Sequence, residues 1–421
     1  MTIVIVDGYS TGAALARRLH NLGVDCLHVQ SQPYVNGFLQ HSFDRSHYAH
    51  DFGYTADQDT LVKQLEQHRV TRVIAGTESG VTVSETLALR LHLPTNTPGL
   101  RAARRDKNLM ARAASAAGLA TPLATVASTP DEAARWFGES ALSEVVVKPM
   151  ASAGTDNVRF CRTVGEVWDA TTAILTARTV FGEANHAALI QERLIGDEYY
   201  INTVSHDGHH RVAEMWRYTK QVGPAGGPIY DYEEPVAADT PEARALREFT
   251  FAVLDALGIR ATPAHTEVMI TERGPVLIEA GARLGGATAP DIVEHYCGVS
   301  QTGLTASALI APETLLSFDD QHATWSCAVR NVEFVNHHHG TADPEAAARI
   351  AELPSVVAVF PAVDSDANLQ PTVDLLSSPG YAYLAAASRD EIERDYTLLR
   401  TWEHAGLHTG GQCPTAAARV A

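Results

Sequence analysis

Two glutamates lie in neighbouring apolar stretches of this chain and could together bind a divalent cation. Glu267 lies in HTEVMIT and Glu279 in VLIEAGA, with a short turn between the two stretches. In an antiparallel hairpin the two carboxylates would meet on adjacent strands and on one face. Because adjacent carboxylates repel, a hard cation such as Mg²⁺, which often bridges carboxylates to phosphate oxygens, is their natural partner. The alternative is that both glutamates are edge or surface residues.

An arginine follows the second glutamate within the run VLIEAGARLGG. Small residues lie between Glu279 and Arg283, and they let a phosphate or substrate approach the backbone. Its planar guanidinium suits bidentate recognition of a carboxylate or a phosphate. The alternative is a structural salt bridge.

Two lysines are placed where they could bind phosphate. Lys107 begins an alanine-rich helical pattern, and Lys148 follows three valines in VVVKP. A lysine at the end of an apolar run either extends to solvent or points at a bound anion. The loop after it contains Ser152, Ala153 and Gly154, and the backbone N–H groups of such a loop could close over phosphates.

A further apolar run, ALIQ, leads into a segment that could take a flat base. Glu192, Arg193, Leu194 and Ile195 follow the run, and Glu198 comes after the next glycine. The apolar residues and exposed backbone could contact a base, and Glu198 could reach a ribose hydroxyl. Strand, turn and strand with acids is a common pattern, so this segment alone is a weak signal.

The first hundred residues would position these groups with a parallel sheet. TIVIVDG, VDCLHVQ and TRVIAG predict short buried strands, and amphipathic helical patterns lie between them. Strands that alternate with helices predict a doubly wound α/β domain. The loop DGYSTG (7–12) opens a helix and could hold an anion there, but it lacks the GxGxxG fingerprint. A nicotinamide oxidoreductase is therefore not favoured.

Beyond residue 106 the pattern becomes mostly antiparallel, which predicts an α+β arrangement. The stretch 143–161 predicts a hairpin or meander. Residues 223–241 are rich in Gly, Pro and acids and predict a long loop, a candidate lid or substrate loop. The predicted division is 1–105 (α/β domain), 106–190 (lid subdomain), 191–310 (catalytic subdomain) and 311–421 (C-terminal α+β segment).

Composition narrows the class of protein. The 421 residues carry a formal net charge of -18, which argues against sequence-independent binding to nucleic acid. Five scattered cysteines without CxxC spacing argue against a disulfide framework or zinc cluster and favour a reducing cytoplasm. The N-terminal apolar run is too short for a signal peptide. No stretch of about 18 apolar residues predicts a membrane span.

The motifs RDKNLM, VVVKPMASAG, IQERLIGDEYYIN, HTEVM and VLIEAGARLGG occur in this order. Together they resemble the ATP-grasp superfamily of carboxylate–amine ligases, and most of all the L-amino acid ligases that form dipeptides. The resemblance covers about residues 106–310; the first hundred residues fit the N-terminal α/β domain of the family less specifically. It implies an ATP-grasp fold, in which a two-subdomain ATP-binding core follows that domain.

The resemblance also implies roles for the residues named above. ATP would bind through its phosphates, its adenine and its ribose, and Mg²⁺, or Mn²⁺ in its place, would be the metal. The phosphates would contact Lys107, Lys148 and the loop from Ser152 to Thr155. The adenine would contact Gln191 to Ile195, and the ribose would contact Glu198. The metal would be bound by Glu267 and Glu279. Arg283 would contact an acyl phosphate or a substrate carboxylate.

One departure from the family is informative. Many ATP-grasp enzymes have an asparagine two residues after the second metal glutamate, and here that position is Gly281. The pattern E-x-x-x-R-x-G-G instead resembles the amino acid ligase branch. The departure argues against an Asn-like metal ligand and favours shared bridging of the metal by the two glutamates.

The resemblance implies a two-step reaction. A substrate carboxylate, expected to be that of an amino acid, attacks ATP to give an acyl phosphate and ADP, and an amine then displaces phosphate to form an amide or dipeptide. Glu214 and His265, which lie near predicted strands, are candidate bases for the amine; the alternative for His265 is a structural role, so the sequence leaves the base open. In the ligase branch the residue after the paired glycines shapes the first-substrate pocket, and here it is the small Ala287. The alternatives are another ATP-grasp ligase or carboxylase, and a non-catalytic nucleotide-binding protein. A homodimer is compatible with the family.

Overall fold

The computed structural model of the chain describes residues 1–35, 37–150, 157–179, 182, 184–223, 228–321, 323–364 and 366–411. Within them the chain forms two compact units. The first takes in Met1–Ala153, Phe160–Met215 and Val236–Thr324, and the second Gly154–Arg159, Trp216–Pro235 and Trp325–Ala421. Every predicted site residue in the described part of the chain lies in the first unit.

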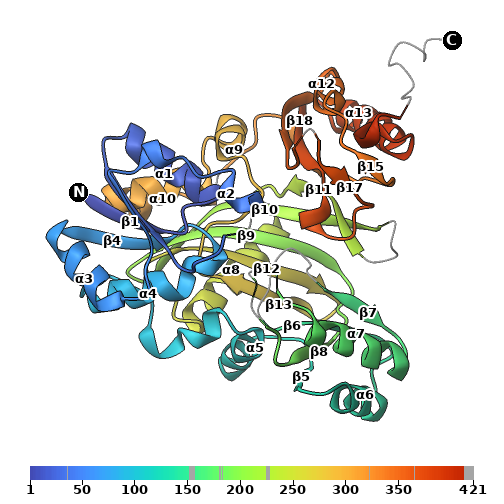
Figure 1. The fold of residues 1–421 in the computed structure, drawn as a ribbon, viewed down its shortest axis with the longest axis horizontal. Helices are drawn as coiled ribbons and strands as arrows, with labels where there is room; N and C mark the ends of the chain where they lie inside the picture. Colours follow the sequence, from blue (N-terminus) through green and yellow to red (C-terminus); the bar gives the residue numbers. More distant parts are fainter. Residues whose placement is uncertain are drawn as a thin grey trace. The chain divides into compact units, whose positions relative to one another are not determined.

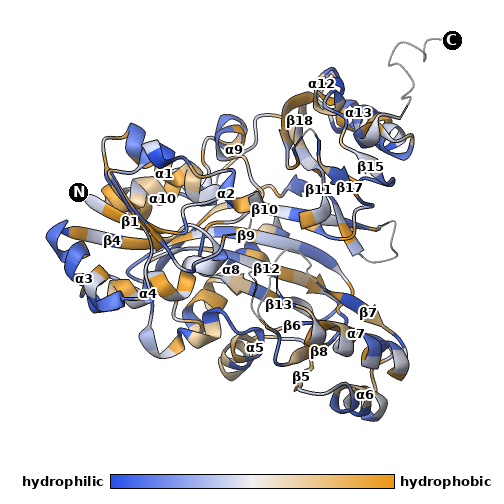
Figure 2. Cartoon of the chain, viewed as in Figure 1, coloured by the Kyte–Doolittle hydropathy of each residue, from blue (hydrophilic) through white to orange (hydrophobic). Residues whose placement is uncertain are grey.

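The N-terminal sheet is parallel, as the alternating pattern predicts. Its strand order is β3-β2-β1-β4, and hydrophobic residues dominate β1 (Figure 2). Helices α1 and α10 cover one face, and α3 and α4 the other (Figure 1). The bounds are β1 Thr2–Val6, α1 Thr11–Asn21, β2 Asp25–Gln30, α2 Gly37–Gln40, β3 His50–Tyr54, α3 Gln58–Gln67, β4 Val70–Ala75, α4 Val81–Arg90 and α10 Gln301–Ile310.

Two features of this sheet do not follow from the sequence pattern. Strand β3 was not predicted, because HDFGY contains no apolar run and its central residues are only half-buried. Helix α10 comes from residues near 300, yet it packs against α1 in a core with Leu15, Leu19, Ala306 and Leu309. The doubly wound layer is therefore completed by a segment far away in the sequence.

A second sheet, antiparallel where β8 pairs with β5 and β6, has the order β5-β8-β6-β7. Helices α6 and α7 lie side by side on one face of it, over a core that includes Val147, Val167 and Ile190 (Figure 1). The bounds are α5 Lys107–Ala116, β5 Ala124–Ala127, α6 Pro130–Glu139, β6 Val145–Pro149, β7 Arg159–Cys161, α7 Val164–Thr176 and β8 Ala188–Glu192. The predicted strands at both ends of the 143–161 stretch are confirmed.

The third sheet of the first unit has the order β13-β12-β9-β10, and α8 packs against it. Strand β10 begins in the first unit and continues into the second from Trp216. The bounds are β9 Asp197–His206, β10 His209–Val222, α8 Pro241–Ala256, β12 Pro263–Thr271, β13 Gly274–Gly281, α9 Pro290–Cys297 and α11 Pro312–Ser317. The predicted hairpin of HTEVMIT and GPVLIEA is thus β12 and β13.

The second unit continues from β10 through β11, β14, β18 and β16, and α12 and α13 cover this sheet. The bounds are β11 Pro228–Pro235, β14 Ala328–Glu333, β15 Gly340–Thr341, α12 Ala346–Ala351, β16 Val356–Pro361, β17 Asn368–Leu369, β18 Gly380–Ala386 and α13 Arg389–His404. The three strands and the final helix predicted for the C-terminal segment are present.

The prediction of one long loop at 223–241 is wrong, because β11 occupies Pro228–Pro235 and pairs with β10 and β14. The acids that suggested a loop are buried in this strand. Asp231 lies 2.6 Å from Arg400, and Glu234 lies 2.8 Å from Arg330. The arginines that neutralise these carboxylates come from residues about a hundred or more positions away, so local composition could not reveal the strand.

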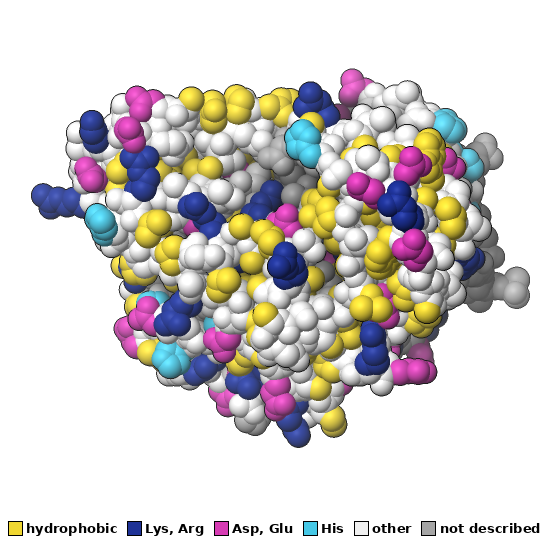
Figure 3. Space-filling model, turned by 90° about the horizontal axis from the view of Figure 1, so that it is seen from below, with side chains coloured by type: hydrophobic (Ala, Val, Ile, Leu, Met, Phe, Trp, Pro, Cys, Tyr) yellow, Lys and Arg dark blue, Asp and Glu magenta, His cyan; other side chains and the backbone are white. Residues whose placement is uncertain are grey.

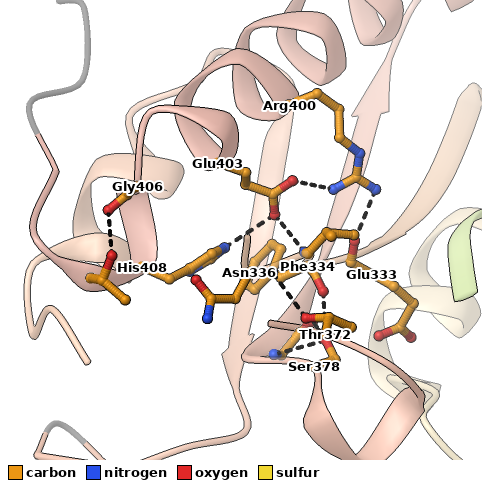
Figure 4. A network of polar contacts seen from close by, with 12 residues as sticks. Glu333, Phe334, Asn336, Thr372, Ser378, Arg400, Glu403, Gly406 and His408 are labelled. Carbon is orange, nitrogen blue, oxygen red and sulfur yellow. Dashed lines mark hydrogen bonds and ion pairs between the residues drawn. The ribbon is translucent and has the colours of Figure 1, made fainter. Parts of the chain in front are cut away.

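A buried carboxylate in α13 ties the second unit together (Figure 4). Glu403 accepts a hydrogen bond from the Val335 N–H at 2.8 Å and forms an ion pair of 2.5 Å with Arg400. His408 Nε2 lies 3.1 Å from Glu403 Oε1, the oxygen that also accepts from Val335. Burial alone would raise the pKa of Glu403, but Arg400 and His408 outweigh it and lower that pKa.

The surface carries both signs of charge. On the face in Figure 3, Lys and Arg side chains are interspersed with Asp and Glu and form no extended basic patch. In the part of the chain that the structure describes, no helix combines the length and the apolar character needed to span a membrane.

Candidate active site

The two predicted metal glutamates face each other in the β12–β13 hairpin. Glu267 pairs directly with Glu279, and the register then shifts so that Val268 pairs with Leu277. The extra residue in β13 is Ile278, which makes a bulge beside the two carboxylates; bulges commonly re-aim side chains near active sites. The side chains of Glu267 and Glu279 are 19% and 28% exposed, so both remain accessible. The predicted pairing is confirmed, and metal binding itself stays a prediction.

Both predicted phosphate lysines lie beside these carboxylates. Lys107, the first residue of α5, places its Nζ 2.5 Å from Glu279 Oε1. Lys148, in β6, is buried, and burial together with Lys107 lowers its pKa to about 8. Glu279, Glu267 and Glu198 partly offset that lowering. A buried lysine whose charge is only partly balanced is well suited to receive an anion.

Arg283 is anchored by a carboxylate from the N-terminal sheet. Its Nε lies 2.9 Å from Glu78 Oε2, and its Nη1 donates to the Leu284 carbonyl. Glu78 also binds Arg105 Nη1 at 2.6 Å. Burial would raise the pKa of Glu78, but Arg105 and Arg283 lower it to about 2. The salt bridge considered as an alternative for Arg283 is therefore present, and it leaves part of the guanidinium available for a ligand.

The two candidate bases belong to one hydrogen-bond chain that ends on Glu267. Asn202 donates through Nδ2 to Glu214 at 3.3 Å, so its Oδ1 accepts from His265 Nδ1 at 2.8 Å. His265 Nε2 then lies 3.4 Å from Glu267 Oε1. Gln301 adds a backbone N–H bond to Glu214 at 3.3 Å. The chain fixes the ring of His265 against the candidate metal ligand.

The glycine run after Arg283 is held against this chain. Gly285 donates its N–H to Gln301 Oε1 at 2.8 Å, and Gln301 Nε2 donates to the carbonyls of Thr203 and Ala264. A Cβ on Gly285 would lie 2.9 Å from Asn202 Oδ1, so the close approach requires glycine there. Ala287 adopts a left-handed φ of 51° and is half-buried.

A small, largely apolar pocket lies between α5, β8 and β13. It is lined by Lys107, Met110, Ala111, Pro122, Ala124, Leu189, Gln191, Leu277 and Ile278. Of the predicted adenine-slot residues, Gln191 is the one whose side chain lines it. The pocket thus lies between the start of α5, which carries Lys107, and the strand that carries Glu279.

The other residues of the predicted adenine slot are placed differently. Glu192 pairs with Arg273 at 2.8 Å and accepts from the Leu123 N–H at 3.1 Å. Arg193 pairs with Glu144 and lies over the ring of Phe160. These two side chains are engaged elsewhere, so the contribution of the segment to a base would come from its backbone.

Leu194 and Ile195 continue as a loop, and the Ile195 side chain is 80% exposed. Glu198 lies in β9 and contributes to the field at Lys148. The predicted phosphate loop, with Ser152, Ala153 and Gly154, lies outside the described residues.

The donor set is compatible with Mg²⁺, although the protein supplies few ligands. Glu267 and Glu279 offer carboxylate oxygens on one face. In the described part of the chain no group of three or more His, Cys, Asp or Glu side chains could hold a metal ion by itself. Mg²⁺ is commonly bound by one or two carboxylates together with substrate phosphates, so this pair fits a metal that arrives with nucleotide.

Sequence reasoning missed Glu78, Arg105, Asn202 and Gln301. Glu78 had a usable signal: it follows the predicted strand TRVIAG, and the carboxyl ends of parallel strands are common positions for ligand-binding groups. The other three act through partners distant in sequence, and the sequence offers no comparable signal for them.

Comparison with known proteins places the chain in a family. A sequence profile described as an ATP-grasp domain matches residues 142–291. Dapdiamide A synthase of Enterobacter agglomerans is 33% identical over 416 residues, which cover 97% of each chain. The chain belongs to the ATP-grasp ligases. It is an ATP-dependent carboxylate–amine ligase, and the predicted enzyme class is confirmed.

Solved structures support the fold of this ATP-grasp ligase. An L-amino acid ligase from Bacillus licheniformis superposes with a TM-score of 0.75 at 19% identity, covering 95% of this chain and 96% of the other. An N5-carboxyaminoimidazole synthase from Aspergillus clavatus gives a TM-score of 0.69 at 13% identity, with 95% and 97% covered. At these identities the likeness concerns the fold, and the predicted ATP-grasp fold is confirmed. ATP-grasp enzymes in general use ATP and Mg²⁺.

Proposed function

We propose that this ligase activates the carboxylate of one amino acid as an acyl phosphate and joins it to the amine of a second, forming a dipeptide or related amide. The observation that carries the proposal is the direct pairing of Glu267 with Glu279 beside Lys107 and Lys148. The family relationship to dapdiamide A synthase supports amide formation over the carboxylase alternative.

We infer that the lysines and the apolar pocket bind the nucleotide. Lys107 and Lys148 would neutralise phosphate oxygens, and Leu277 and Ile278 would contact the base together with the backbone of 191–195. Glu198 would bind the ribose. The loop that contains Ser152, Ala153 and Gly154 would cover the phosphates through its backbone.

Glu267 and Glu279 would hold Mg²⁺, or Mn²⁺ in its place. The metal, when bound, neutralises charge on the phosphates during transfer. His265, Asn202 and Glu214 would position Glu267, and Lys107 would move from Glu279 toward the phosphates. Phosphoryl transfer needs in-line positioning and charge neutralisation more than covalent help from the protein.

Arg283 would stabilise the acyl phosphate and the charge that develops when the amine attacks it. Losing one such charged contact typically costs about 2–4 kcal/mol of transition-state stabilisation, or about 10²–10³ in rate. Water must stay away, since it would hydrolyse the acyl phosphate. The half-buried Ala287 would border the pocket for the first side chain.

We propose that the chain is divided into four segments. Residues 1–105 would form the N-terminal α/β domain, 106–190 the lid subdomain and 191–310 the catalytic subdomain, and residues 311–421 the C-terminal segment. The separate sheets β5-β8-β6-β7 and β13-β12-β9-β10 support the division between lid and catalytic parts. ATP and two amino-acid-like substrates would be the partners, and a homodimer is the oligomer we propose.

Product screening tests the function. Purified protein, ATP and Mg²⁺ are incubated with pairs of amino acids, and ADP release and new amides are measured by mass spectrometry. We expect ADP release that depends on the amino acids, together with a dipeptide mass. ATP turnover without any amide would contradict the ligase proposal.

A matched pair of variants locates the chemistry. Glu279→Gln should abolish amide formation, because it removes a charged metal ligand while keeping the size of the side chain. Glu248→Gln makes the same chemical change at an exposed position in α8 and should leave turnover unchanged. Near wild-type turnover in Glu279→Gln would refute the metal role.

A further inference from the structure

Glu78 connects the N-terminal sheet to the arginine of the candidate site. It follows β4 in a short 3₁₀ turn, and its side chain is 10% exposed. Each of its oxygens receives a different arginine: Oε1 receives Arg105 Nη1 at 2.6 Å, and Oε2 receives Arg283 Nε at 2.9 Å. A carboxylate held between two guanidinium groups stays ionised, consistent with the lowered pKa described above.

The bond to Glu78 fixes the orientation of the Arg283 guanidinium. Nε donates to Glu78, and Nη1 donates to the Leu284 carbonyl at 2.9 Å. Among the residues that the structure describes, Nη2 of Arg283 has no hydrogen-bond acceptor. Because a guanidinium is planar and rigid, fixing two of its nitrogens also fixes the direction in which the third presents its donors.

Gly281 provides the space that this arrangement needs. A Cβ built at residue 281 would lie 2.7 Å from Glu78 Oε2 and 3.3 Å from Arg283 Nε. The glycines with a positive φ do not include Gly281, so its backbone is accessible to other residues. The requirement for glycine is therefore steric, since any side chain at 281 would compete with the Glu78 carboxylate for the same space.

We propose that Glu78 is the positioning residue for Arg283 in the ligase reaction, and that residue 281 must be glycine so that the Glu78 carboxylate can reach the guanidinium. The inference rests on the proposed role of Arg283 toward the acyl phosphate. Glu78 itself does not contact substrate: it holds Nε, while the Leu284 carbonyl holds Nη1, so that Nη2 points at the reacting group. Pre-set donors of this kind need no reorganisation during the reaction.

Glu78→Gln tests the positioning role. The amide still fills the space but loses the charge, so we expect kcat to fall by about 10- to 100-fold, the order that a small misplacement near the reaction causes. The KM for ATP should change less than about threefold, because Nη2 would act on the acyl phosphate. Glu78→Asp, which keeps the charge on a shorter chain, should recover part of kcat.

Glu85→Gln is the matched control. Glu85 forms a similarly buried pair with Arg104, at 2.6 Å, in the same N-terminal region. Its loss should lower the melting temperature at least as much as Glu78→Gln, and it should leave kcat of the folded protein within about twofold. Equal effects of both variants on kcat would reduce Glu78 to a structural salt bridge and overturn the proposal.

A double-mutant cycle tests the role of Gly281. In the wild-type background Gly281→Ala should lower both kcat and the melting temperature, because its Cβ displaces the carboxylate. In a Glu78→Ala background the same change should add less than about a twofold loss in kcat, since the space is already vacant. Losses that multiply independently would overturn the steric half of the proposal.

The outcomes separate this proposal from the ligase function itself. A wild-type protein that makes no amide contradicts the function. The double-mutant cycle, read from melting temperatures, then still decides whether a Cβ at residue 281 and the Glu78 carboxylate compete for the same space. An active wild type with unchanged Glu78→Gln kinetics contradicts only the positioning role.

Discussion

Replacing Lys148 with methionine should stabilise the empty protein at pH 7 while weakening its binding of nucleotide. The ammonium of Lys148 is buried, and burial and Lys107 lower its pKa from 10.5 to about 8. Methionine fills similar space without a charge, so it removes the energetic penalty of burying the ammonium. The lysine is thus expected to be retained for binding at the expense of stability.

The size of the effect follows from the pKa. The difference between 10.5 and about 8, at about 1.36 kcal/mol per pH unit, corresponds to about 3 kcal/mol of unfolding free energy. For a base whose pKa is lower in the folded state, the destabilisation is complete below pH 8. It fades as the pH rises from 8 to 10.5, because the lysine of the unfolded chain then loses its proton as well.

Urea unfolding at pH 7 and at pH 10 measures this directly. Lys148→Met should be about 3 kcal/mol more stable than wild type at pH 7 and less than about 1 kcal/mol more stable at pH 10. Calorimetry should show ADP binding weakened by at least about tenfold, the loss of one charged contact. Lys107→Met is the control: it removes a lysine paired with Glu279 and should not stabilise. A variant less stable than wild type at both pH values would refute the reasoning.

Three further predictions concern stability and metal. Glu403→Gln should lower the unfolding free energy at pH 7 by about 3 kcal/mol, because it breaks a buried ion pair. The difference from wild type should shrink as the pH falls below 4.5 and through the lowered pKa of Glu403, because the wild-type carboxylate then becomes protonated. Urea titrations at several pH values measure both effects. Burial and Glu233 raise the pKa of Glu333 well above 4.5. The buried carboxyl is therefore neutral at low pH, and its contribution to stability is lost as the pH rises through the raised pKa, where it must ionise. Glu333→Met should therefore be more stable than wild type at pH 8, by about 1 kcal/mol or more, in the same assay. ADP should raise the melting temperature of wild type by several degrees more with Mg²⁺ than with EDTA, and Glu267→Gln should remove that difference in a thermal-shift assay.

Much of the fold was predictable because local patterns determined it. TIVIVDG and VDCLHVQ alternate with amphipathic helical patterns, and they form the parallel strands β1 and β2. HTEVMIT and GPVLIEA, separated by a short turn, form an antiparallel hairpin because the turn folds the two strands back against each other. Strand β11 was not predictable, since the shortest ion pairs of Glu234 and Asp231 are with Arg330 and Arg400, which are remote in sequence.

Some features of the candidate site were likewise predictable from the sequence, and others were not. The pairing of Glu267 with Glu279 follows from residue type and hairpin geometry, whereas the expectation that Lys107 and Lys148 serve the same site came from the resemblance to the ATP-grasp ligases. The orientation of Arg283 does not, because Glu78 comes from another sheet and about two hundred residues away. Likewise the contact of His265 with Asn202 depends on the pairing of β9 with β12.

The sequence by itself determined the chemical groups of this protein and the hairpin that pairs its two glutamates, because hairpin contacts are short-range and period-two alternation sets which side chains share a face. Only the tertiary structure decided which charges are buried, which carboxylate holds Arg283, and why residue 281 is glycine. The physical reason is that burial and ion pairing depend on distances between segments that are remote in sequence. Lys148 illustrates what each level determines. Its residue type and position in the sequence suggested phosphate binding, but its lowered pKa arises from the packing around it.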